Sequence, residues 1–140
     1  MKISKKVKYG FKALAYIATE TSKDRMVRIK EISEKENISI QYLEQILYRL
    51  KNKKIIEGKR GPSGGYKLIV EPEKVTLYEI YVILDEDPMI INCNEAYQFK
   101  RSIECVEKDC SCIWKKLDDK MKEILEAYTI KDIIENRSII

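Results

Sequence analysis

The chain of 140 residues contains no histidine. Without histidine, neither a Ser-His-Asp nor a Cys-His nucleophilic pair can be assembled, and a histidine metal ligand is impossible. The one glycine-rich stretch, GPSGG at residues 61–65, fits neither the dinucleotide-binding nor the P-loop spacing. We therefore predict that the chain is not an enzyme.

Long apolar segments are also missing. No run of about 18 apolar residues occurs, and the N-terminal MKISKKVKYG lacks the apolar core of a signal peptide. We expect a soluble, cytoplasmic protein that does not enter a membrane. The length suits one domain with a real core, or a small domain with a dimerisation arm.

Charge is distributed unevenly along the chain. Residues 1–70 hold 17 of the 27 Lys and Arg and 7 of the 23 Asp and Glu, a balance of +10. Residues 71–140 hold the other 10 and 16, a balance of −6. A basic first half is typical of a segment that meets a polyanion, although a solvated charged surface gives the same count.

Helical periodicity predicts a helix-turn-helix in the first half. Ser4 can cap a helix over residues 5–21 whose apolar face is Val7, Phe11, Leu14 and Ala18. A short extended piece at 26–29 leads into a helix of two turns with Ile32 inward. Asn37 suits the left-handed residue that ends a helix, and Ser39 is a fresh N-cap. The helix from residue 40 has an inward face of Ile40, Leu43, Ile46, Leu47 and Leu50.

The outer face of this last helix has the chemistry of base reading. Its N-terminal end, which enters the major groove in helix-turn-helix proteins, carries Gln and Glu, and cations follow toward its C-terminal end. Gln can pair with adenine and Glu can accept from the cytosine amino group. Any surface helix shows the same residue types, so this face alone does not decide the function.

A β-hairpin follows directly. One strand begins at Ile55, and a second returns through Tyr66, Leu68 and Val70. Between them lies the turn GKRGPSGG, where glycine and proline favour a sharp reversal. A hairpin after a recognition helix is the wing of a winged helix, and Arg60 at its tip could enter a minor groove. A hairpin without a binding role is the alternative.

Two further helices are predicted in the second half. Thr76 and Glu79 form a capping-box pattern that opens a helix. Residues 113–128 carry an apolar stripe, which either lies on the chain's own core or meets a partner helix. The stripe consists of Trp114, Leu117, Met121, Ile124, Leu125 and Tyr128. Residues 129–136 then start a last helix that can fold back.

All four cysteines lie between these helices, at Cys93, Cys105, Cys110 and Cys112. Because cytosolic chains seldom use structural disulfides, the cluster favours metal or redox chemistry. Thiolates without histidine suit an iron–sulfur cluster of two or four irons, or zinc, and the spacing does not discriminate.

The succession ISIQYLEQILYRLKNKKIIEGKRGPSGGYKLIV, with the opening MKISKKVKYGFKAL, resembles the Rrf-two (Rrf2) family of bacterial winged-helix regulators, which includes the IscR, NsrR and CymR types. The resemblance covers nearly the whole chain. It implies a mainly α fold with a small β-hairpin wing, a winged helix-turn-helix plus a long dimerisation helix. It also implies a homodimer on palindromic double-stranded DNA. The DNA contacts that the resemblance implies are Ser39, Gln41, Tyr42, Glu44 and Gln45 in the groove, and Arg60, Gly61, Ser63 and Gly64 in the wing. The cations Arg49 and Lys59 are predicted with them as DNA-binding residues.

The resemblance also bears on the cysteines. Many members bind an iron–sulfur cluster through three cysteines in this loop, and it implies Cys93 and Cys105 as ligands. Cys110 and Cys112 either provide one further ligand between them or are both ligands. In some members an acidic residue of the first helix is the fourth ligand, but here Lys8 takes that place.

The predicted organisation has three parts: a winged helix-turn-helix domain at 1–86, a cysteine-containing effector loop at 87–112, and a dimerisation helix with a C-terminal helix at 113–140. The predicted function is sequence-specific transcriptional regulation in which an iron–sulfur cluster modulates operator binding and senses iron–sulfur supply, oxygen, nitric oxide or cellular redox state. The alternative keeps the DNA-binding regulator without a cluster, controlled by a protein partner, thiol oxidation or zinc.

Overall fold

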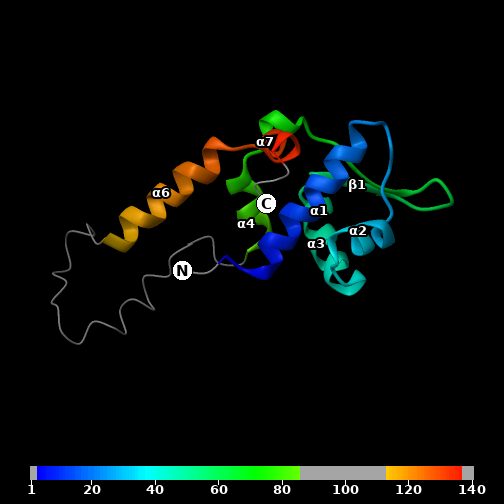
Figure 1. The fold of residues 1–140 in the computed structure, drawn as a ribbon, viewed down its shortest axis with the longest axis horizontal. Helices are drawn as coiled ribbons and strands as arrows, with labels where there is room; N and C mark the ends of the chain where they lie inside the picture. Colours follow the sequence, from blue (N-terminus) through cyan, green and yellow to red (C-terminus); the bar gives the residue numbers. More distant parts are fainter. Residues whose placement is uncertain (1–2, 86–112, 137–140) are drawn as a thin grey trace.

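The computed structural model describes residues 3–85 and 113–136. The first three helices are α1 (Lys5–Thr21), α2 (Ile29–Glu36) and α3 (Ile40–Asn52). A hairpin of β1 (Ile56–Lys59) and β2 (Gly65–Leu68) follows, then the short η1 (Pro72–Lys74) and α4 (Leu77–Leu84). The chain continues with α6 (Ile113–Ala127) and α7 (Ile130–Glu135). This is the predicted mainly α architecture with a small hairpin, and Figure 1 shows the hairpin and α6 projecting from opposite ends of a helical body.

Local capping signals set the helix boundaries as predicted. The Ser4 hydroxyl accepts a hydrogen bond from the backbone N–H of Val7 at the start of α1 (3.3 Å). Asn37 ends α2 in the left-handed conformation (φ 54°). At the start of α4, the Thr76 hydroxyl and the Glu79 carboxylate each accept from the other residue's backbone N–H (3.2 and 2.8 Å). The first backbone N–H groups of a helix have no partner within the helix. A side chain that accepts their hydrogen bonds therefore fixes where the helix begins.

The core lies where α1, α3 and α4 meet. Its largest fully buried side chains include Leu14 and Ile17 of α1, Leu43 and Ile46 of α3, and Leu84 of α4. The predicted inward face of α3 is confirmed at Leu43, Ile46, Leu47 and Leu50 but is wrong at Ile40, which is 41% exposed. Ile40 is the first residue of the helix.

The hairpin is antiparallel, with Ile56 opposite Leu68 and Lys59 opposite Gly65. Each strand differs by one or two residues from its predicted bounds. A third segment joins it at one point, where Val27 and Tyr66 exchange backbone hydrogen bonds of 2.9 and 2.7 Å. The hairpin is thereby attached to the chain just ahead of α2.

The last helix folds back, as predicted, and joins the core. Ile130 of α7 is fully buried, and α7 packs against α1. The Ile130 N–H donates to the Val75 carbonyl (3.0 Å), and the Leu77 N–H donates to the Tyr128 carbonyl (2.9 Å). The predicted segment 113–140 thus contains a helix, α7, that is part of the same core as α1.

The apolar stripe of α6 divides between two environments. Met121 and Leu125 are half-buried against the core, and the Lys122 ammonium lies 5.1 Å from the ring centroid of Tyr78 in α4. Leu117 and Ile124, by contrast, are 39% and 58% exposed. Within the part of the chain that the structure describes, nothing covers these two side chains.

Candidate nucleic-acid interface

Helix α3 presents a polar outer face opposite its buried one. Four residues of this face, Gln41, Glu44, Gln45 and Tyr48, are exposed and line a shallow depression together with Arg49. The spacing of three and four residues places them in one stripe. Three of the predicted base-reading residues, Gln41, Glu44 and Gln45, are therefore side by side and accessible, and Tyr48 joins them.

The two other residues predicted at this end of α3 have structural partners. The Ser39 hydroxyl caps the helix by accepting from the Tyr42 N–H (3.3 Å). The Tyr42 ring meets the Tyr9 ring of α1 edge to face, with centroids 5.6 Å apart and planes at 82°. Both residues remain at the border of the outer face, where they fix the position of α3 against α1.

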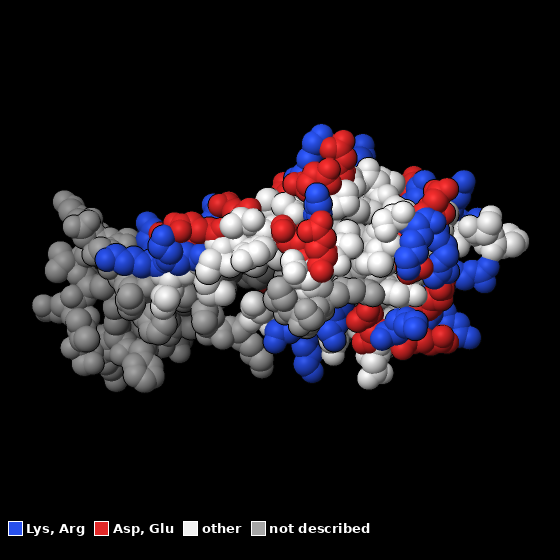
Figure 2. All heavy atoms as spheres, turned by 45° about the horizontal axis from the view of Figure 1, so that its top comes forward, with Lys and Arg blue, Asp and Glu red and all other residues white. Residues whose placement is uncertain are grey.

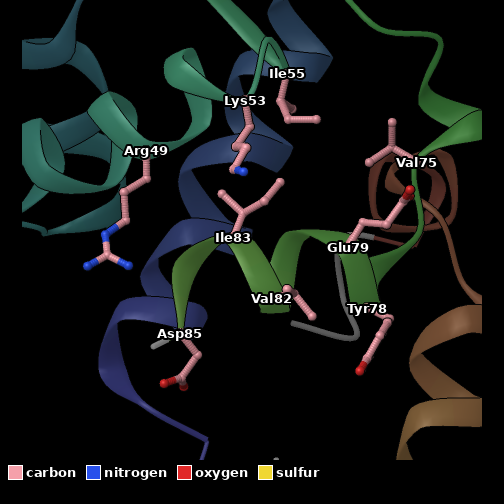
Figure 3. A pocket seen from close by; sticks show the side chains of 9 residues that line it. All are labelled: Arg49, Lys53, Ile55, Val75, Tyr78, Glu79, Val82, Ile83 and Asp85. Carbon is pink, nitrogen blue, oxygen red and sulfur yellow. The ribbon is translucent and has the colours of Figure 1, made fainter. Parts of the chain in front are cut away.

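Arg49 connects α3 to α4. Its guanidinium donates to the backbone carbonyl of Leu84 (3.4 Å), the last residue of α4. Arg49 also lines a groove between the C-terminal end of α3 and α4, with Lys53, Ile55 and Ile83 among its other walls. Figure 3 shows the Lys53 ammonium directed toward Ile83, into this groove. Arg49 is thus placed between the exposed outer face of α3 and α4, and its contact with DNA stays a prediction.

The tip of the wing exposes its cations. Lys59, Arg60 and Ser63 are all exposed, at the end of the hairpin farthest from the core. Gly61 has φ 110°, a conformation that favours glycine, and its carbonyl accepts from the Gly64 N–H (3.0 Å) to close the turn. A side chain at Gly61 would meet nothing within 4 Å, so the tip is open on that side.

The other two glycines of the turn serve the hairpin itself. A Cβ at Gly64 would overlap the carbonyl oxygen of Lys59, and one at Gly65 would lie 2.7 Å from the carbonyl oxygen of Val27. Gly64 is buried, so in this conformation its closest neighbours are protein backbone atoms. Of the three glycines, only Gly61 has the open surroundings that the predicted close approach to DNA needs.

An ion-pair network holds the chain that leads to the wing. The Arg25 guanidinium lies 2.8 Å from the carboxylates of both Glu20 and Glu31. Its hydrogen bond to Glu31, and then that of the Arg28 backbone N–H, hold the pKa of the Glu31 carboxyl below its ordinary value. For Glu20, the hydrogen bond from Lys23 and then that from Arg25 lower the pKa of the carboxyl. Glu31 also accepts from the Arg28 N–H (3.1 Å) at the start of α2.

Arg28 then reaches the wing directly, because its guanidinium donates to the carbonyl oxygen of Pro62. The two residues are 34 positions apart. Sequence reasoning missed Arg28, since nothing local in the sequence marks so distant a contact. Figure 2 shows Lys and Arg at the wing end of the molecule and along the lower edge of this view, with carboxylates between them.

The predicted cysteine ligands, Cys93, Cys105, Cys110 and Cys112, lie outside the described residues. That segment leaves the end of α4 and returns at the start of α6. Within residues 3–85 and 113–136, no group of three or more His, Cys, Asp or Glu side chains could hold a metal ion. In the same residues, no helix is both long and apolar enough to cross a membrane.

The chain matches a known protein family over most of its length. The family model Rrf2, described as an iron-dependent transcriptional regulator, matches residues 3–136. A regulator named IscR from Cereibacter sphaeroides is 29% identical over 137 residues, covering 97% of this chain and 88% of its own. Relatives of this kind are transcriptional regulators, which confirms the prediction that the chain is not an enzyme.

Solved structures show the same fold. The chain is similar to CymR, described as the global cysteine regulator of B. subtilis, with a TM-score of 0.76, 28% identity, and coverage of 96% of this chain and 97% of the other. An oxidised form of Staphylococcus aureus CymR matches with a TM-score of 0.73, 28% identity and the same coverage.

Proposed function

The chain belongs to the Rrf2 family of transcriptional regulators, and we propose that it binds a palindromic operator as a homodimer whose affinity is set by an iron–sulfur cluster. The observation that carries the DNA-binding part is the joint placement of the exposed α3 face and the cationic wing tip. A helix can read base edges in the major groove, and Arg60 can enter the adjacent minor groove.

In this proposal Gln41, Glu44 and Gln45 read base edges. Their amide and carboxylate groups offer the donors and acceptors that distinguish base pairs in the major groove. Lys59, Arg60 and Ser63, with the open backbone at Gly61, contact the minor groove and its phosphates. Ser39, Tyr42 and Arg49 contact phosphates from the border of the α3 face, while Gly64 acts by shaping the turn.

The exposed half of the α6 stripe supports the homodimer. Leu117 and Ile124 are large apolar side chains on a helix that projects from the body (Figure 1), and a symmetric partner helix would remove them from water. Two recognition helices related by twofold symmetry would match a palindrome with half-sites about one helical turn, or 34 Å, apart.

The proposed cofactor is held by Cys93, Cys105 and one or both of Cys110 and Cys112. Thiolate donors fit an iron–sulfur cluster of two or four irons, and that cluster would provide redox chemistry and stabilise the segment that holds it. Because this segment joins α4 to α6, a bound cluster could bias how the two recognition helices are spaced.

A second candidate keeps the DNA-binding regulator and replaces the cluster by thiol oxidation, zinc or a protein effector. The similarity to CymR, including a structure of an oxidised form, favours thiol oxidation among these. The two candidates differ in colour, because a protein with an iron–sulfur cluster is brown and a thiol switch or zinc site is colourless.

The test has two stages. First, the wild-type protein selects duplexes from a random DNA pool, and enrichment of a palindrome bound by a dimer is the expected result. Second, anaerobically reconstituted protein is studied by absorption and Mössbauer spectroscopy, and its operator affinity is compared with that of the cluster-free form. Colourless protein with stoichiometric zinc, or a cluster without effect on affinity, would leave the second candidate standing.

A further inference from the structure

The N-terminal half of α1 carries lysines that the core does not use. Lys5 and Lys8 are exposed and Lys12 is half-buried, and their spacing of three and four residues places them along one side of the helix. Residues 3–19 contain no Asp or Glu, since the first carboxylate in the chain is Glu20. Within residues 3–85 and 113–136, these three lysines form no ion pair.

Tyr9 fixes where these lysines lie relative to the recognition helix. It follows Lys8 directly, and its ring meets the ring of Tyr42 in the first turn of α3 (centroids 5.6 Å apart). Gln41 and Gln45 of the proposed base-reading face are close to Tyr42 along the same helix. The N-terminal end of α1 is therefore beside the end of α3 that would enter the major groove.

The wing lies on the other side of α3. In Figure 1 the hairpin projects to the right of α3, whereas the N-terminal end of α1 lies to its left. A helix in the major groove, which is about 12 Å wide, has a phosphate strand on each side. The wing can hold one of these strands, which leaves the other opposite α1.

We propose that Lys5, Lys8 and Lys12 form a second phosphate-binding surface, which flanks α3 on the side away from the wing and contacts the DNA backbone independently of sequence. This inference rests on the proposed DNA-binding function. It also gives a role to Lys8, which stands where some members of the family have an acidic ligand.

A purely structural role does not explain these lysines. Cations in the first turns of a helix oppose the helix dipole, so Lys5 and Lys8 do not stabilise α1. Neutral glutamine at the same positions should therefore leave the melting temperature unchanged or slightly raised, and a loss of DNA binding in such variants would report a lost contact.

The test compares Lys5→Gln, Lys8→Gln and the double variant with Lys131→Gln. Lys131 is an exposed lysine on α7, which Figure 1 shows on the opposite side of α1 from α3. Fluorescence anisotropy measures binding to a random-sequence duplex and to the best duplex that the wild type selects from a pool, over a series of salt concentrations.

We expect each α1 variant to lose affinity several-fold, by the same factor for both duplexes, and to reduce the slope of log K against log salt by about 0.9 per lysine. Lys131→Gln should match the wild type. An unchanged slope in the double variant, or an equal loss in Lys131→Gln, overturns the proposal while wild-type binding still supports the proposed function. Failure of the wild type to bind either duplex would refute the proposed function itself.

Discussion

The guanidinium of Arg28, at the start of α2, donates a hydrogen bond to the carbonyl oxygen of Pro62 in the tip of the wing. Its neighbour Val27 pairs with Tyr66 through two backbone hydrogen bonds. Two consecutive residues thus hold the wing at β2 and at its tip. This short segment is one of the contacts that position the wing.

Arg28→Ala should therefore weaken operator binding without unfolding the protein. Loss of one hydrogen bond costs about 0.5–1.5 kcal/mol. Because this bond holds the wing tip, its loss should let the wing move away from the position that binds DNA. Operator affinity by anisotropy and the melting temperature check this. Lys30→Ala, which removes an exposed cation from the same helix, is the matched control. Equal effects of the two substitutions would contradict a positioning role for Arg28.

Arg60→Ala should lower operator affinity and leave both dimerisation and the melting temperature nearly unchanged, because the exposed wing tip contributes little to the core. Anisotropy at physiological salt and sedimentation are the measurements. Undiminished affinity would refute the minor-groove contact.

Replacement of Glu44 or Gln45 by alanine should reduce the difference between operator and random DNA by about 1–3 kcal/mol, since both side chains are exposed on the proposed reading face. Lys59→Gln is the control for a phosphate contact and should weaken binding to both DNAs alike, with a smaller salt slope. A specificity ratio that survives Glu44→Ala would show that this residue does not read bases.

Ile124→Asp should convert the proposed dimer to a monomer, because it places a charge where a partner helix would exclude water. Its 58% exposure means that the fold of one chain should tolerate the change. Lys115→Asp, at an exposed polar position of the same helix, should remain a dimer. Analytical ultracentrifugation distinguishes the outcomes, and a dimer in both variants would exclude this face of α6 as the interface.

Stability should fall in acid through the Arg25 network. The folded-state pKa values of Glu20 and Glu31 are below their ordinary value of 4.5, so the stabilisation is present above that pH and is lost as the pH falls through the folded-state values. Arg25→Gln should make the melting temperature less dependent on pH below about 4.5. If the melting temperatures of the wild type and Arg25→Gln changed with pH in the same way, the network would contribute nothing measurable to stability, as for many surface ion pairs.

The sequence by itself determined the helices and the class of the fold. The caps at Ser4, Ser39 and Thr76 and the left-handed Asn37 were all predictable, because each involves groups within a few residues of one another. The amphipathic pattern of α3 likewise predicted which face is buried, except at its first residue. Local hydrogen bonding and helical periodicity are encoded over short stretches of chain.

Only the tertiary structure decided which helices and strands contact one another, and through which residues. The contact of Arg28 with Pro62, the pairing of Tyr9 with Tyr42 and the burial of Ile130 against α1 join residues that are far apart in the sequence. The sequence does not say why each glycine of the wing is needed. In the structure, nearby backbone atoms require glycine at positions 64 and 65, and a positive φ favours it at position 61. Such differences depend on which atoms the folded chain brings within a few ångströms, and no local pattern specifies that.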